Sequence, residues 1–426
     1  MNGIQQFFQQ NPLPTLTVIG LIAIVSFYFG KLSKLIRLPL IIGYMFLGVL
    51  IGPSFLNLFS STIQNQLSFI TEIALGFVAL SIGLELKFSD LKKQGAGIIW
   101  IIFAESFGAF ILVFFAVWLV TGNLPLALIF GSIAPASAPA GTVAVIREYR
   151  AKGNLTKALY AVVGFDDGLG IIIFGFATAI AKNILMHQTG TASGGIVGLF
   201  LLPLKEIALS IIIGLAVSTL FCLLVRKLKS TGDYFIHIFG VVLFMVGLSH
   251  ALHLSLILTN MTAGIIVINT QRFNLIEMMH KEMMNIMPLL FVLFFTLAGT
   301  NLHISALPSL GLLGIVYIIA RSAGLIGGSR LGALFGNVSV NVRKYLGLGI
   351  LSQAGVAIGL SLIVKQDFSG LGKMVTTAKD IMIPSGDLVG GMVITVITAT
   401  CIFFEIIGPI LTKVALTKAG EISKDE

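Results

Sequence analysis

The stretch GFDDGLGIIIFGFATAI, residues 164–180, places two adjacent aspartates, Asp166 and Asp167, in a segment that is otherwise apolar. A segment of this length and character predicts a membrane-spanning helix. An ionisable side chain within the hydrocarbon costs about 2.5–3.5 kcal/mol on insertion scales, so such side chains are rare there. Two consecutive acids on one helix cannot both reach the lipid surface. We therefore expect them to face a water-filled cavity or a cation, and they are the candidate functional site.

The composition of the whole chain is that of a polytopic membrane protein. Its 426 residues have a mean hydropathy of +1.01, 56% are hydrophobic and only 11% are charged. Soluble domains carry about 25% charged residues. Because backbone groups in lipid must be satisfied within the segment, repeated apolar stretches of about 20 residues predict an all-α fold.

The ends, the cysteines and the net charge indicate no other class. The N-terminal MNGIQQFFQQNPLP has no basic region and no small-residue cleavage site, so we expect no removed signal peptide. Cys222 and Cys401 offer neither a disulfide framework nor metal-ligand spacing. The net charge of +9 comes from basic residues in short loops, so we expect the lipid bilayer, not nucleic acid, as the partner.

The apolar segments predict 13 transmembrane helices. They cover residues 13–30, 38–56, 66–84, 96–120, 124–146, 157–181, 197–225, 234–250, 254–271, 284–302, 307–335, 345–364 and 388–412. Of the 27 Lys and Arg residues, 21 fall in one set of alternate loops, five in the other, and Arg321 lies within a span. Since basic loops stay in the cytoplasm, this predicts a multi-pass protein of the inner (plasma) membrane with its N-terminus outside and its C-terminus cytoplasmic.

Two of these segments are predicted to be discontinuous. The span at 124–146 contains IAPASAPAGTVAV, in which Pro139 cannot donate to the carbonyl of Pro135. The span at 345–364 contains GILSQAGVAIGLSL, in which Gln353 and Gly355 interrupt the apolar run. The two segments are seven spans apart and so cross the membrane in opposite directions. Interrupted segments at corresponding places in two inverted repeats indicate the binding site of a transporter.

The basic residue Arg321 lies inside the span at 307–335, one turn before glycines 324, 328, 332 and 336. The four-residue spacing of these glycines predicts a face on which another helix packs closely. We expect Arg321 to pair with Asp166 or Asp167. The remaining carboxylate would then bind either a proton or a small hard cation, and this competition is the chemistry of an antiporter. The alternative is a purely structural ion-pair cluster.

Further oxygen ligands are expected near the breaks. Ser137 and Thr142 follow the first interruption and carry hydroxyl oxygens suited to hard cations. The alternative is that each hydroxyl bonds to its own helix, as is usual for Ser and Thr in spans. Glu105 and Glu405 are expected in the cytoplasmic half, where they would line an inward funnel that attracts cations; the alternative is a partner hydroxyl or helix packing.

Taken together, these motifs resemble the monovalent cation:proton antiporter superfamily, in the branch of bacterial Na+/H+ and K+/H+ exchangers. The resemblance covers nearly the whole chain. The matching stretches are RLPLIIGYMFLGVLIGP (37–53), ITEIALGFVALSIGLELKFSDLKK (70–93), SAPAGTVAVIREYRAKG (137–153), GFDDG (164–168), MPLLFVLFFTLAGTNL (287–302), ARSAGLIGGSRLGALFG (320–336), SQAGVAIGL (352–360) and EIIGPILTKVALTKAGE (405–421).

The resemblance implies a homodimer in which a mobile six-helix core moves against a scaffold, with two discontinuous helices crossing beside the aspartates. The dimerisation (scaffold) domain would be 1–93 and 233–304, the core ion-transport domain 94–185 and 305–417, the linking helix 186–232, and the cytoplasmic tail 418–426. Asp167 matches the family's ion- and proton-binding aspartate. Asp166 is typical of electrogenic members and Arg321 of many electroneutral ones, so both stoichiometries stay open.

The sequence therefore predicts a secondary active antiporter, not an enzyme, that exchanges a monovalent cation for protons and serves pH homeostasis. Asp167 and Asp166, with Ser137 and Thr142, are the candidate cation ligands. No cofactor is expected beyond the transported Na+ or K+ and H+. The chain ends without the nucleotide-binding domain of many potassium-efflux relatives, which favours Na+, and K+/H+ exchange is the alternative.

Two functions of other classes are also compatible with acids in a membrane. An intramembrane aspartyl protease would place its acids on separate helices across a cleft, whereas these two have Cα atoms only about 3.8 Å apart and diverging side chains. A channel would need a continuous pore and has less use for a titrating acid. Ion flux measured with and without a proton gradient separates a channel from an exchanger.

Overall fold

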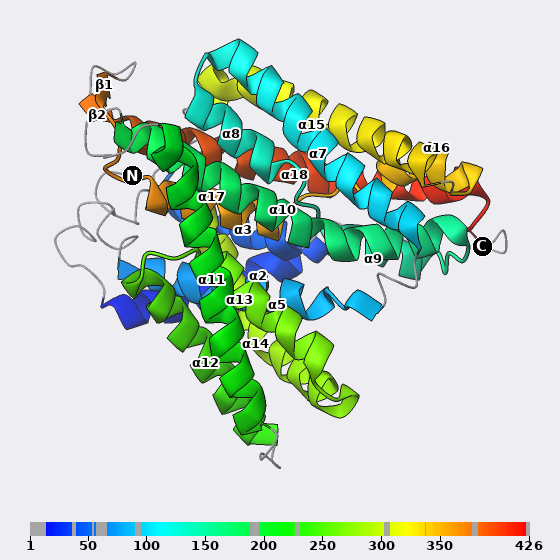
Figure 1. The fold of residues 1–426 in the computed structure, drawn as a ribbon, viewed down its shortest axis with the longest axis horizontal. Helices are drawn as coiled ribbons and strands as arrows, with labels where there is room; N and C mark the ends of the chain where they lie inside the picture. The colour runs from blue at the N-terminus through cyan, green and yellow to red at the C-terminus, as the bar shows by residue number, and fades with distance from the viewer. Residues whose placement is uncertain are drawn as a thin grey trace.

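The computed structural model describes residues 14–35, 40–52, 55–56, 66–89, 95–187, 189, 196–225, 231–301, 307–336, 338–376 and 382–422. It is a bundle of α-helices with one short hairpin (Figure 1). The N-terminal residues 1–13, where we expected no cleaved signal, lie outside the described residues. So do the last four residues of the predicted tail, 423–426.

The elements follow one another as apolar helices separated by short loops. Their bounds are α2 Thr15–Leu35, α3 Leu40–Ile51, α5 Ser68–Glu85, α7 Ala96–Thr121, α8 Leu124–Ile133, α9 Pro139–Glu148, α10 Asn154–His187, α11 Ile196–Val225, α12 Thr231–Ala251, α13 Leu256–Thr270, α14 Phe273–Thr300, α15 Leu307–Phe335, α16 Val340–Gly349, α17 Gly355–Asp367, β1 Met374–Thr376, β2 Met382–Pro384 and α18 Ser385–Ala419.

The polytopic α-helical fold predicted from composition is confirmed. Within the described residues, nine helices are long and apolar enough to cross a membrane, and α3, α8 and α13 are shorter apolar helices. The longest, α10 and α18, have 34 and 35 residues and extend beyond the predicted spans. At about 1.5 Å per residue, both exceed the thickness of the hydrocarbon core.

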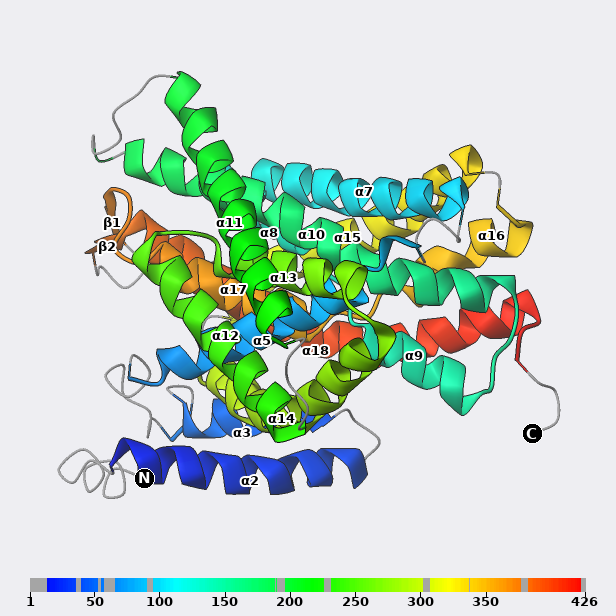
Figure 2. The same cartoon turned by 60° about the horizontal axis from the view of Figure 1, so that its bottom comes forward.

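The helices pack in two groups that meet along α10. One group contains α7–α10 and α15–α18, and the other contains α2, α3, α5 and α11–α14. Figures 1 and 2 show α7 and α12 on opposite sides of the bundle, with α10 between them. In both views the β1–β2 hairpin and the last turn of α18 lie at opposite ends of the molecule.

The predicted glycine face of α15 is confirmed as the contact with α7. A Cβ atom built on Gly328 would lie 2.3 Å from the carbonyl oxygen of Ala104, and one built on Gly332 would lie 2.5 Å from that of Trp100. Backbone atoms thus occupy the space of a methyl group. Such close approach allows two apolar helices to associate in lipid through van der Waals contact.

The two predicted interruptions are present in the described chain. Helix α8 ends at Ile133 and α9 begins at Pro139, the first helical position, where the missing N–H of proline costs no hydrogen bond. Helix α16 ends at Gly349 and α17 begins at Gly355. The two unwound segments, 134–138 and 350–354, contact each other directly, because the Ala138 N–H donates to the Ser352 carbonyl at 2.9 Å.

Candidate functional site

The candidate site is built where the unwound segments 134–138 and 350–354 meet the middle of α10. Unwinding frees backbone groups that a continuous helix would pair internally, and in a buried setting each needs a partner. The carbonyls of Ala134, Ala136 and Leu351 are three such groups. All of them accept hydrogen bonds from one side chain, Arg321 of α15.

The partner expected for Arg321 was wrong. Its guanidinium donates from Nε to Ala134 at 2.9 Å, from Nη1 to Leu351 at 2.8 Å and from Nη2 to Ala136 at 2.9 Å. The side chain is completely buried. Among the residues that the structure describes, no carboxylate lies within 4.0 Å of it, so Arg321 pairs with neither Asp166 nor Asp167.

Backbone dipoles explain why an arginine is stable in this position. The carbonyl ends of α8 and α16 both point their partial negative charge at the guanidinium. The Phe404 ring adds a cation–π contact, with the Arg321 Cζ atom 4.4 Å from the ring centroid. Nearby, Gln353 donates to the Ala136 and Ile133 carbonyls and exchanges hydrogen bonds with the Tyr317 hydroxyl. The Gln353 amide thus provides further hydrogen bonds to backbone carbonyls at the first break.

Asp167 faces the opposite, N-terminal side of the first break. Its Oδ1 accepts a 3.0 Å hydrogen bond from the backbone N–H of Ser137, two residues before α9 begins. The partial positive charge of a helix N-terminus favours a carboxylate in this place. Asp167 keeps 4% of its surface exposed, whereas Asp166 has none, so Asp167 is the acid nearer to solvent.

Asp166 makes a hydrogen bond within its own helix. Its Oδ1 accepts a 2.7 Å hydrogen bond from the Asp167 N–H. Its Oδ2 and the Ser137 Oγ are both buried, and neither makes a hydrogen bond of 3.5 Å or less within the described part of the chain, although the Ser137 hydroxyl is near enough to interact with the Asp166 carboxyl group. A buried polar oxygen without a partner is costly. These two oxygens are therefore free to accept from a proton-bearing group or to coordinate a cation.

Thr142 lies one turn into α9 and has a defined partner. Its hydroxyl donates to the Gly349 carbonyl, the last of α16, at 2.7 Å. The structure therefore brings Asp166, Asp167 and Ser137 together directly, while Thr142 joins the two broken helices to each other. Its bond crosses to another helix, so the alternative that the hydroxyl bonds to its own helix is wrong for Thr142.

Two further acids lie close to the pair. Glu105 of α7 is completely buried, accepts a 2.7 Å hydrogen bond from the Ser106 hydroxyl and interacts electrostatically with both aspartates, so of the two expected alternatives the packed position with a partner hydroxyl is the one observed. Glu85, the last residue of α5, is exposed and also interacts electrostatically with both. Glu85 was not among the residues predicted to belong to the site. The signal was an acid at the end of an apolar span, which resembles any interfacial residue.

The comparisons with known proteins identify the family and the fold of the chain. The transmembrane sodium/hydrogen exchanger family matches residues 20–414, nearly the whole chain. The protein belongs to that family. Exchange of cations for protons across a membrane is thus its class of activity, and the exchanger is a transporter, not an enzyme, as predicted. The same finding argues against the aspartyl protease.

The named proteins that the exchanger resembles are also described as antiporters. A curated relative, the ammonium/H+ antiporter subunit AmhT of Alkalihalophilus pseudofirmus, is 26% identical over 372 residues, covering 84% of this chain and 85% of the relative. The solved structure of the sodium proton antiporter MjNhaP1 from Methanocaldococcus jannaschii at pH 8 matches with a TM-score of 0.75 and 17% identity. That match covers 95% of this chain and 98% of the other, and at this identity it establishes the fold.

Proposed function

We propose that the exchanger moves a monovalent cation, preferentially Na+, against protons by alternating access, and that Asp167 binds the cation and the proton competitively. The observation that carries the proposal is the place of Arg321. Because its guanidinium is bound to three backbone carbonyls, it neutralises neither aspartate by direct contact.

A buried carboxyl group without a counter-ion in contact has two low-energy states, one with a bound proton and one with a bound cation. Burial of an unpaired charge costs many kcal/mol, so the group binds a proton or a cation instead. Asp167 and Asp166 are both in this situation, with Glu105 adding a third acid nearby. The unpaired oxygens of Asp166 and Ser137 are suited to a cation bound at Asp167, and Thr142 is the more remote candidate ligand.

The stoichiometry that follows is electrogenic. If Arg321 had neutralised Asp166, only Asp167 would exchange, and one proton would move per cation. Since neither acid is paired with Arg321, both are available to release protons when the cation binds. We therefore propose two protons per Na+.

The proposed movement assigns roles to the two helix groups. The core is 94–185 and 305–417, with the segments α8–α9 and α16–α17 as crossing discontinuous helices of two inverted repeats and 13 crossings in all. The scaffold, 1–93 and 233–304, forms the homodimer contact, and 186–232 links the parts. The N-terminus is outside and the tail 418–426 is cytoplasmic. The exposed Glu85 is then at the cytoplasmic end of α5, where it gives cations a polar approach to Asp167.

Ion selectivity has two further candidates. K+ is the alternative within the same chemistry. Ammonium is a second, because the AmhT relative is named for ammonium/H+ antiport. Ammonium is a hydrogen-bond donor, so it would use the unpaired Asp166 and Ser137 oxygens as acceptors, whereas Na+ would use them as ligands.

The experiment is reconstitution of the purified protein in liposomes containing a pH-sensitive dye. Addition of Na+, K+ or Li+ to acid-loaded vesicles is expected to restore dye fluorescence, most strongly with Na+. Ammonium is tested as a competitor of radioactive sodium uptake, since ammonia crosses lipid unaided. The matched control is Asp167→Asn, expected to fold but not to exchange. Full exchange by that variant would refute the role of Asp167.

A further inference from the structure

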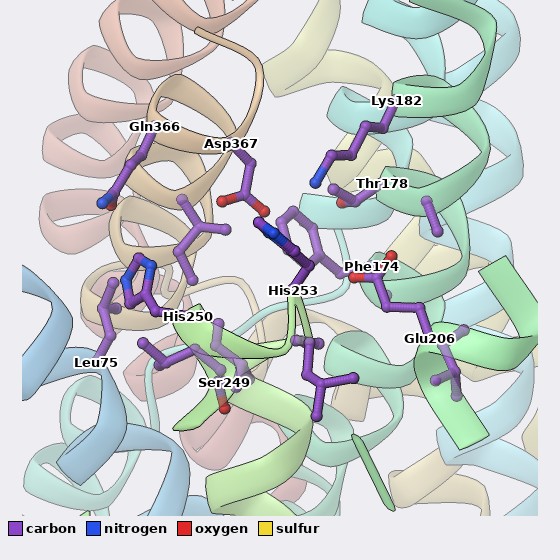
Figure 3. Close-up of a pocket in the computed structure, with 18 of the residues that line it drawn as sticks. Leu75, Phe174, Thr178, Lys182, Glu206, Ser249, His250, His253, Gln366 and Asp367 are labelled. Carbon is purple, nitrogen blue, oxygen red and sulfur yellow. The ribbon is translucent and has the colours of Figure 1, made fainter. Parts of the chain in front are cut away.

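A pocket of about 110 Å³, lined by both polar and apolar side chains, lies beside α10 (Figure 3). Its walls come from α5, α10, α11, α17 and the connection between α12 and α13. Along α10, Asp167, Ile171, Phe174 and Thr178 succeed one another at three- or four-residue intervals, so they share one face. Thr178 is 11 residues from Asp167, roughly 16 Å along the helix.

An apolar layer separates this pocket from the aspartates. Ile171 of α10, Leu75 and Ile82 of α5, and Leu360 of α17 line a small apolar space, and along α10 Ile171 lies between Asp167 and the pocket residue Phe174. Leu75 and Phe174 also line the pocket itself, so they form its floor. Under the proposed topology, the pocket is the external mouth of the transport route, closed from Asp167 by these side chains.

The pocket is lined by three acids, Glu72, Glu206 and Asp367, and by three basic side chains, Lys182, His250 and His253. Asp367 at the end of α17 and Glu206 of α11 both interact electrostatically with Lys182 of α10, and Figure 3 shows the three side chains directed into the same space. Within the described residues, Lys182 forms no ion pair shorter than 4.0 Å. The Lys182 ammonium group therefore interacts with both carboxylates without forming a direct ion pair with either.

An unpaired buried hydroxyl points into this space. Thr178 is 8% exposed, and its Oγ1 has no hydrogen-bond partner among the residues described. In Figure 3 the Thr178 hydroxyl lies beside the end of the Lys182 side chain, on the side away from Asp367. A buried oxygen that its own helix does not use is available as a ligand.

The rim of the pocket is closed by a contact between the two helix groups. Glu72 of α5 forms a 2.8 Å ion pair with His250 of α12 and accepts a hydrogen bond from Gln366 of α17. Glu72 is thus occupied by its own partners. Asp367 and Glu206, together with Thr178, remain as the oxygen donors that face the interior.

We infer that this pocket is a second cation-binding site, in which Asp367, Glu206 and Thr178 hold a partly hydrated monovalent cation at the external mouth. The inference rests on the proposed topology and deepens the proposed function. Carboxylate and hydroxyl oxygens are ligands for hard cations, and the pocket has room for a cation with some of its water. Lys182 acts as a tethered competitor, because its ammonium is attracted by the same two carboxylates.

The test is direct binding of radioactive sodium to purified full-length protein at about pH 8, where exposed carboxylates are ionised. Asp167→Asn should retain bound sodium, and adding Asp367→Asn or Thr178→Val should remove that remainder. Loss of all sodium binding in Asp167→Asn alone would overturn the second site. So would an unchanged remainder after Asp367→Asn. Because this comparison needs no transport, it still decides the second site if the exchange proposal fails.

Transport kinetics give an independent test, because two variants are expected to shift the half-saturating Na+ concentration in opposite directions. In oriented vesicles, Asp367→Asn is expected to raise the external Na+ concentration for half-maximal rate about tenfold, and Lys182→Gln to lower it. The matched control is Asp387→Asn, which removes the same charge at the same end of the bundle but outside the pocket. An equal effect of Asp387→Asn would show a diffuse surface field instead of a site.

Discussion

The backbone N–H of Ser137 donates a 3.0 Å hydrogen bond to Oδ1 of Asp167, which couples the acid on α10 to the unwound segment before α9. The contact has two consequences. It places the carboxyl group at the N-terminal end of a half-helix, and it leaves the carbonyl ends of α8 and α16 to Arg321. The breaks therefore separate the acid from the fixed positive charge, so the acid is free to bind a transported ion.

The first prediction concerns Arg321. Arg321→Ala leaves the carbonyls of Ala134 and Leu351 without their side-chain donor, at about 1–3 kcal/mol for each unsatisfied group, while the Ala136 carbonyl keeps its bond from Gln353. We expect a large loss of thermal stability, measured as Tm in detergent. Arg321→Lys keeps the charge but not the planar fork, so it should show an intermediate Tm and retain exchange with an altered pH profile. A wild-type Tm for Arg321→Ala would contradict the bracing role of these bonds.

The second prediction concerns Asp166 and the transported charge. In Asp166→Asn the amide oxygen can still accept from the Asp167 N–H, so the helix should stay intact. With one titrating acid left, exchange should continue at one proton per cation. The Na+-driven current on a supported membrane should then disappear while radioactive sodium uptake persists. A current that survives unchanged would show that Asp166 carries no moving charge.

The third prediction tests the contact between α7 and α15 with two neighbouring glycines. In Gly328→Ala the new methyl would lie 2.3 Å from the Ala104 carbonyl oxygen, so the two backbones must move apart. In Gly327→Ala the methyl meets nothing within 4 Å. We expect Gly328→Ala to lower Tm clearly. Gly327→Ala should be neutral or stabilising by up to about 1 kcal/mol, because alanine is the better helix former. Equal Tm values for the two variants would refute the close-packed contact.

The features that could be predicted from the sequence are those that depend on the spacing of residues within one segment. The adjacent aspartates, the proline and glutamine interruptions and the four-residue glycine spacing each have a local signature. The glycine face in particular meets α7 backbone, as its period indicated.

The partner of Arg321 was not predictable in this way. The charges of the side chains suggested that a carboxylate would be the partner. The acceptors are instead backbone carbonyls, which lack a helical hydrogen-bond partner only because two helices unwind side by side. The external pocket was missed for a related reason. Glu206 and Asp367 are 161 positions apart in the chain, and only packing of α11 near α17 brings them to one space.

The central claim is that Asp167 binds a proton or a cation, never both. The most direct measurement is the Na+ concentration for half-maximal exchange as a function of pH. Because the ligand must be deprotonated, competition predicts that this concentration rises about tenfold for each unit of acidification where only Asp167 releases a proton, and up to about a hundredfold where Asp166 releases a second one, at constant maximal rate. A half-saturating concentration that does not change with pH, while the maximal rate falls, would contradict the account.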